Sequence, residues 1–137
     1  MNVPRVRIAL RRLALAGSAL TFGFIALGSI VAPAQVAAQY AYTVGTADSF
    51  NEFHAVFTGF WLGLCAWMLT AARRWEDRRL GDLAGIAIGL QALARLLSIV
   101  MHGTPAPSFT SAMIGEMVTA VIILQGGPPI EAAAARR

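Results

Sequence analysis

The stretch LGDLAGIAIGLQALARLLSIVM, residues 80–101, decides the fold. It contains two charged side chains, Asp82 near its start and Arg95 deep inside it. Its length meets the roughly 20 apolar residues that an α-helix needs to cross a bilayer. The whole chain has a matching composition, with 57% hydrophobic residues, 13% charged residues and a mean hydropathy of +0.63. Soluble domains contain about 25% charged residues, so the sequence predicts an integral membrane protein.

Four segments satisfy the same length criterion: Leu13–Ala34, Phe53–Ala72, Leu80–Met101 and Phe109–Gln125. The run Gly126, Gly127, Pro128, Pro129 cannot continue a helix and ends the last segment. We therefore expect an all-α fold, a four-helix transmembrane bundle. Residues 13–125 form its single domain, residues 1–12 a basic N-terminus, and residues 126–137 a tail.

The first segment has an alternative interpretation. Arginines precede a hydrophobic run, and the run ends in APAQVAAQ, residues 32–39, which resembles a signal-peptide cleavage region. Cleavage there would give a mature chain that starts near Gln39. The apolar run is longer than the 7–15 residues typical of a signal core, so an uncleaved helix is favoured.

The positions of the arginines predict the orientation. The two loops at residues 35–52 and 102–108 contain no lysine or arginine. Basic residues accumulate on the cytoplasmic side of membrane proteins. Both termini and the middle loop are therefore expected in the cytoplasm, in a bacterial inner membrane. The flanking arginines are Arg5, Arg7, Arg11, Arg12, Arg73, Arg74, Arg78, Arg79, Arg136 and Arg137.

Arg95 lies inside the third apolar segment, where an unpaired charge is costly, so we expect it to have an acidic partner. Glu116 in the fourth segment is the acidic residue placed to meet it, since Asp82 lies at the cytoplasmic edge. Arg95 precedes His102 by seven residues, and Glu116 follows Phe109 by seven, so both lie roughly 10 Å below the outer surface. Helices joined by a short loop are antiparallel neighbours. We expect a bidentate pair of guanidinium and carboxylate groups.

The pair has two interpretations. An architectural ion pair fixes which helices meet and in what register. A functional pair would be a gate or an ion site, as intramembrane charges often are. Gln91, Arg95, Ser98 and His102 share one helical face, and Gln91 and Ser98 would extend the site. With Asn51, these residues form the predicted intramembrane polar cluster: Arg95, Glu116, Gln91, Ser98 and Asn51.

The second segment starts with SFNEFHAVFTGFWLGLC, residues 49–65. Ser49 and Glu52 have the spacing of a capping box. Five residues recur along one helical face: Asn51, His54, Thr58, Trp61 and Cys65. His54 and His102 lie at outer helix ends and are weak candidates for a metal or haem site, because no compact ligand spacing accompanies them. Cys65 is expected to be an inert packing residue.

Small residues repeat at four-residue intervals in two segments. These positions, Gly59/Gly63 and Gly81/Gly85/Gly89, let another backbone approach closely. We expect them to contact the chain's own helices, a second copy or other membrane subunits, and the remaining surface to contact the lipid bilayer.

The sequence lacks a phosphate-binding loop, a nucleophile elbow and paired catalytic carboxylates. We therefore expect no enzyme, no cofactor and no nucleic-acid partner. The predicted function is a non-catalytic or accessory membrane component. A small ion-coupled transporter using Arg95 and Glu116 and a metal- or haem-binding subunit are the alternatives.

Several stretches together resemble a bacterial domain-of-unknown-function family of small four-helix membrane proteins. They are NEFHAVFTGFWLGL at residues 51–64, ARLLSIVMHGTP at residues 94–105, and a glutamate in the last helix. The resemblance covers about residues 40–125. It places the family's recurrent polar residues at Asn51, Arg95, Gly103, Pro105 and Glu116, and aspartate often stands at the position of His102. It implies an architecture and no activity.

Overall fold

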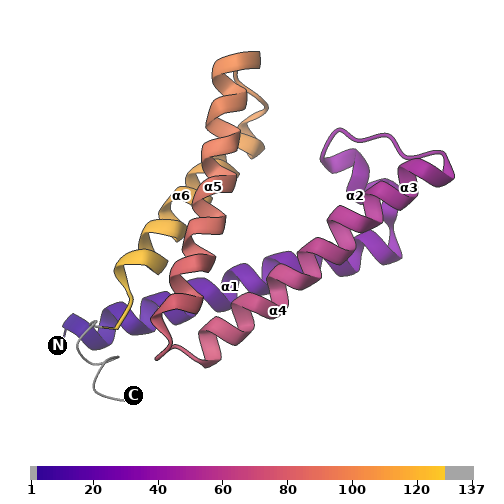
Figure 1. Ribbon diagram of the computed structural model, residues 1–137. Helices are drawn as coiled ribbons and strands as arrows, with labels where there is room; N and C mark the ends of the chain where they lie inside the picture. The colour runs from indigo at the N-terminus through magenta and orange to yellow at the C-terminus, as the bar shows by residue number, and fades with distance from the viewer. Residues whose placement is uncertain (1–2, 129–137) are drawn as a thin grey trace. The chain divides into compact units, whose positions relative to one another are not determined.

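The computed structural model describes residues 3–128, which form helices joined by short loops and contain no strand. The elements are α1 (Val3–Val31), α2 (Pro33–Gln39), α3 (Ala47–Phe53), the π-helix η1 (His54–Phe60), α4 (Trp61–Arg73), α5 (Arg78–His102) and α6 (Pro107–Gln125). Figure 1 shows their order along the chain. Arg136 and Arg137, and most of the predicted tail, lie outside the described residues.

Four helical stretches are long and apolar enough to cross a membrane, which confirms the predicted number. They are Arg5–Val31, Ala47–Arg73, Arg78–His102 and Pro107–Gln125. The second stretch runs without interruption through α3, η1 and α4. The protein is therefore an all-α, multi-pass membrane protein.

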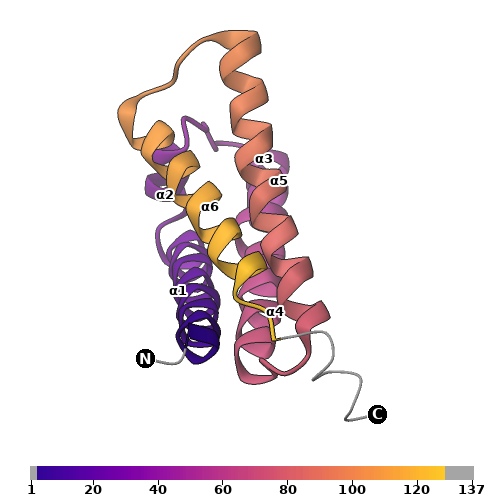
Figure 2. The ribbon, with the colours of Figure 1, turned by 90° about the vertical axis from the view of Figure 1, so that its left-hand side faces the viewer.

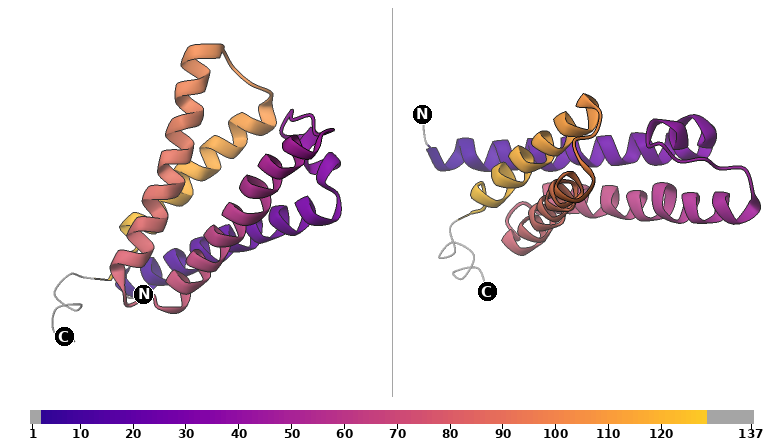
Figure 3. Two further views of the ribbon diagram at one scale, coloured as in Figure 1. Left: turned by 45° about the vertical axis from the view of Figure 1, so that its right-hand side comes forward. Right: turned by 90° about the horizontal axis from the view of Figure 1, so that it is seen from above.

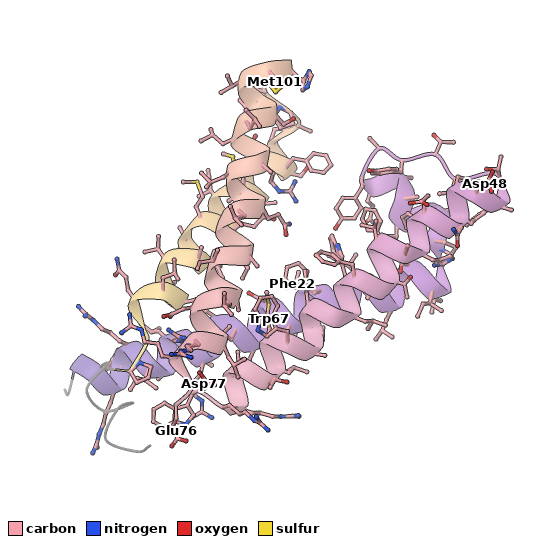
Figure 4. All side chains as sticks on the ribbon, in the orientation of Figure 1. Phe22, Asp48, Trp67, Glu76, Asp77 and Met101 are labelled. Atoms are coloured by element: carbon pink, nitrogen blue, oxygen red, sulfur yellow. The ribbon has the colours of Figure 1, made fainter. Side chains whose placement is uncertain are left out.

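The helix ends follow from local chemistry. The Asp77 side chain caps α5 by accepting a hydrogen bond from the backbone N–H of Arg79 (3.1 Å). At the other end of α5, Gly103 adopts a φ of +90°, which favours glycine. Asp77 and Met101 mark these two ends in Figure 4. Pro107 begins α6, where its missing N–H has no cost.

The second span begins earlier than predicted, and the predicted cap is wrong. Thr46 is the N-cap of α3, and its hydroxyl accepts a hydrogen bond from the backbone N–H of Ser49 (3.2 Å). The Ser49 hydroxyl in turn accepts one from the N–H of Thr46 (3.0 Å). Ser49 is therefore the third residue of the helix instead of its cap. Glu52 lies one turn further on and is exposed.

The chain divides into two compact units, and α1 contributes to both. Unit 1 contains residues 1–15 and 70–137, and unit 2 contains residues 16–69. In unit 1, α5 and α6 form an antiparallel hairpin (Figure 2). The face of α5 that carries the glycines is covered by α6: Gly85 faces Ile123 and Leu124, and Gly89 faces Ala120. Large aliphatic side chains elsewhere on both helices are exposed, as expected for helices in lipid.

Unit 2 is built around aromatic side chains. Its part of α1 runs beside the continuous helix of α3, η1 and α4 (Figure 3). Phe22 of α1 packs edge-on against Trp61 of α4, with ring centroids 5.4 Å apart. Ala37 of α2, Phe53 and Phe57 form the buried core, against which Ile25, Val36, Tyr40, Val44 and Trp61 pack.

Candidate functional site

The predicted contact between Arg95 and Glu116 is present in unit 1. Arg95 Nε donates to Glu116 Oε2 (2.9 Å) and Oε1 (3.2 Å). The geometry differs from the expected bidentate fork, because one nitrogen serves both oxygens. The side chains of Arg95 and Glu116 keep 27% and 17% of their exposure. Counting residues from the outer helix ends was therefore sufficient to place the two groups at one depth.

Gln91 completes this cluster. Its amide Nε2 donates to Glu116 Oε1 (2.7 Å), one helical turn before Arg95 on α5. Both carboxylate oxygens of α6 are thus held by side chains of α5. The other predicted members do not join. Ser98 is exposed and makes no side-chain hydrogen bond among the described residues, and Asn51 is exposed on α3 in unit 2. We call Gln91, Arg95 and Glu116 the mid-membrane cluster.

A second polar cluster in unit 1 was not predicted. Its centre is Arg11, whose side chain is 2% exposed. Arg11 Nη1 donates to Asp82 Oδ1 (2.7 Å) and to the carbonyl of Ile123 (2.9 Å). Its Nη2 donates to the carbonyl of Arg78 (2.7 Å). One guanidinium therefore joins the start of α1, the start of α5 and the end of α6.

Asp82 serves two arginines in this cluster. Arg78 Nε donates to its Oδ2 (3.0 Å), and Arg78 Nη1 donates to the carbonyl of Pro128 (3.2 Å). Glycines make the room for Arg11, because a Cβ on Gly81, Gly126 or Gly127 would overlap its side chain. We call Arg11, Arg78 and Asp82 the arginine junction. A sequence signal existed in the spacing of Arg78 and Asp82, which is the i, i+4 spacing of a helical ion pair.

Unit 2 contains a chain of neutral hydrogen bonds. The Ser29 hydroxyl on α1 lies 2.6 Å from the Thr58 hydroxyl and 2.7 Å from the carbonyl of Ala26. Thr58 in turn lies 3.0 Å from His54 Nδ1. Ser29 is fully buried, whereas Thr58 and His54 are half-buried. We call Ser29, Thr58 and His54 the hydroxyl–imidazole chain.

Two members of this chain, His54 and Thr58, lie on the π-helix η1, His54–Phe60. A π-helical turn is rare and frequently occurs at functional sites. Two residues of the predicted polar face, His54 and Thr58, meet within it. Trp61 packs against Phe57, with ring centroids 5.2 Å apart, and Cys65 is half-buried beside Gly23.

The weak metal candidates lie in different units. His54 is in unit 2, and His102 is exposed at the end of α5 in unit 1. Residues 3–128 contain no group of three or more His, Cys, Asp or Glu side chains that could hold a metal ion. The pairing of these two histidines remains a prediction.

Residues 10–125 match the family described as Domain of unknown function (DUF4345). The chain belongs to this family. The matched residues include the first span from residue 10 onward, the other three spans, Arg11 and the mid-membrane cluster. Searches of the curated proteins and of the solved structures gave no match.

Proposed function

We propose that this DUF4345 protein is a non-catalytic, accessory component of the bacterial inner membrane. The observation that carries the proposal is the binding of Glu116, a carboxylate inside the span Pro107–Gln125, by Gln91 and Arg95 of the neighbouring helix. A carboxylate bound in this way holds the two helices α5 and α6 in one register. Breaking such a contact leaves an unpaired charge in a medium of low polarity, which is costly.

The arginines support a specific orientation. Both termini and the loop between α4 and α5 face the cytoplasm in this proposal, because basic flanking residues are retained there. Reporter fusions after Arg12, Arg79 and Arg137 should indicate cytoplasm, and fusions at Thr46 and Pro105 should indicate the opposite side. A cytoplasmic signal at Thr46 would contradict the proposed orientation.

Association with other membrane subunits is the proposed accessory role. The Gly59/Gly63 face is the better candidate surface, since a Cβ built on Gly63 meets no atom of the described residues within 4 Å. The Gly81/Gly85/Gly89 face is covered within the chain by Arg11 and α6. Purification from native membranes should recover stoichiometric partner subunits, and Gly63→Leu should reduce their recovery more than Gly115→Leu.

One observation favours a second candidate, an ion-coupled transporter. Arg95 binds Glu116 through Nε, and the described residues provide no hydrogen-bond acceptor for its two Nη groups. Those N–H groups could receive an anion. The double variant Arg95→Met, Glu116→Leu separates the candidates in a deletion strain. A folded variant that restores the wild-type phenotype supports the accessory role, and a folded variant that fails supports transport.

The third candidate, a metal- or haem-binding subunit, is tested on purified protein. A stoichiometric metal or a visible absorbance band that disappears in both His54→Ala and His102→Ala would favour it. The proposal predicts neither signal.

A further inference from the structure

The hydroxyl–imidazole chain has a direction that its chemistry determines. A carbonyl oxygen can only accept, so the hydroxyl proton of Ser29 goes to the carbonyl of Ala26 (2.7 Å). Ser29 is fully buried, so water does not compete for this proton. Its oxygen is then the acceptor in the contact with Thr58 (2.6 Å).

The same reasoning continues to the histidine. Thr58 has one hydroxyl proton, which it donates to the Ser29 oxygen. Thr58 can therefore only accept from His54, so His54 Nδ1 carries a hydrogen and donates it over 3.0 Å. In the neutral imidazole one nitrogen is a donor and the other an acceptor. The chain thus selects the tautomer in which a neutral His54 ring has its unshared electron pair on Nε2.

The His54 ring has two aromatic neighbours. Phe50 stacks on the His54 ring with centroids 6.4 Å apart and an interplanar angle of 22°. Phe53 meets it edge-on at 5.8 Å. His54 begins η1, about two turns into the span that starts at Ala47. A ligand that reaches Nε2 would therefore meet flat apolar rings and arrive from the membrane.

We propose that His54 is a binding residue whose Nε2 accepts a hydrogen bond from the hydroxyl of a membrane-soluble aromatic alcohol, of the phenol or quinol class. Ser29 and Thr58 are positioning residues that hold the imidazole in the accepting tautomer. One acceptor beside aromatic rings matches one hydroxyl on a flat ring, and the low polarity strengthens such a bond. This site lies in unit 2 and does not depend on the proposed accessory role.

The tautomer is tested first, on the full chain in lipid nanodiscs. The sequence has two histidines, so the ¹⁵N spectrum of histidine-labelled protein contains two imidazoles, and His102→Phe assigns them. We expect neutral His54 as the Nδ1–H form. We expect Thr58→Val to mix the two tautomers and Thr58→Ser to restore the single form. A neutral Nε2–H form in the wild type would overturn the proposal.

Binding is tested with a decyl-substituted hydroquinone and with its dimethyl ether, which keeps the ring and lacks the hydroxyl donors. The hydroquinone should shift the Nε2 resonance of His54 and bind at least about tenfold more tightly than the ether, as expected for one hydrogen bond in an apolar site. His54→Phe keeps the aromatic ring and should remove this difference, while His102→Phe should retain it. Equal binding of the two probes would overturn the proposal. So would a Zn²⁺ titration that shifts His54 when the hydroquinone does not.

Discussion

The two units of this protein accommodate polar side chains among apolar helices by different kinds of contact. Unit 1 places three arginines and two carboxylates among apolar helices and pairs them with one another in the arginine junction and the mid-membrane cluster. Unit 2 buries a hydroxyl and connects it to a second hydroxyl and an imidazole. Removing one partner of a buried ion pair leaves an unpaired charge and costs much stability. A neutral hydrogen bond contributes less to stability, but it fixes the orientation of a side chain. We therefore expect the polar contacts of unit 1 to contribute more to stability than those of unit 2, which contains the proposed binding residue His54.

The arginine junction should produce the largest loss. Arg11→Met removes three hydrogen bonds and leaves Arg78 as the remaining partner of Asp82. Breaking a buried pair costs about 3–5 kcal/mol, so we expect a sharp drop in melting temperature in detergent. Arg12→Met is the matched control, because Arg12 is the exposed neighbour, and it should change stability by less than about 0.5 kcal/mol. Equal losses of stability in Arg11→Met and Arg12→Met would show that the arginine junction contributes no more than an exposed flanking arginine.

The mid-membrane cluster should produce a smaller loss, since Arg95 and Glu116 remain partly exposed. We expect Arg95→Met and Glu116→Leu each to cost about 2–3 kcal/mol. The double variant should lose less than the sum, because no unpaired charge remains. A double-mutant cycle measured by denaturant unfolding gives the coupling energy. Strict additivity would mean that the two residues have separate partners.

Glycine substitutions compare close packing with open surface. In Gly81→Ala the new methyl group would overlap the Arg11 guanidinium, and we expect a cost of about 1–3 kcal/mol. Gly63→Ala meets open space within the described residues and should be neutral or stabilise the helix by up to about 1 kcal/mol. Thermal unfolding of both variants measures the difference. A destabilised Gly63→Ala would indicate that this face packs against another helix.

The neutral chain should produce the smallest effect. Ser29→Ala removes one hydroxyl and leaves Thr58 without that partner, which costs about 1 kcal/mol. Ser18→Ala is the control, because Ser18 is half-buried on the same helix and makes no side-chain hydrogen bond among the described residues. A loss in Ser29→Ala as large as that of Arg11→Met would contradict the contrast between the two units.

The number of spans and the contact between Arg95 and Glu116 could be predicted from the sequence for a physical reason, whereas Ser98 and Asn51 were wrongly assigned to the cluster. Long apolar runs and an isolated charge are strong local signals in a membrane protein. The pairing of Arg95 with Glu116 needed one further step, the counting of residues from the ends of adjacent helices.

Other features depend on information that the local pattern does not contain. Arg11 looks like one of several flanking arginines, and its burial depends on packing against α5 and α6, which lie far along the chain. The capping-box pattern predicted Ser49 with Glu52 as the cap of α3, because glutamate is the usual third helical residue of that motif. The structure instead uses Thr46 with the hydroxyl of Ser49, one turn earlier. In the π-helix, side chains point in directions that differ from those in an α-helix. The sequence HAVFTGF contains no residue pattern that predicts a π-helix.

The arginine junction also has a consequence for how the protein is made. Arg11 is synthesised before Ile123, whose carbonyl it binds across a separation of 112 residues in the chain. The complete junction therefore cannot form until α6 has been synthesised and packed against α1, and until then the guanidinium lacks that acceptor. Loss of the N-terminal segment ahead of Gln39 would remove Arg11 and leave the carbonyls of Arg78 and Ile123 without their donor. A chain that lacks either α1 or α6 therefore cannot form the complete junction.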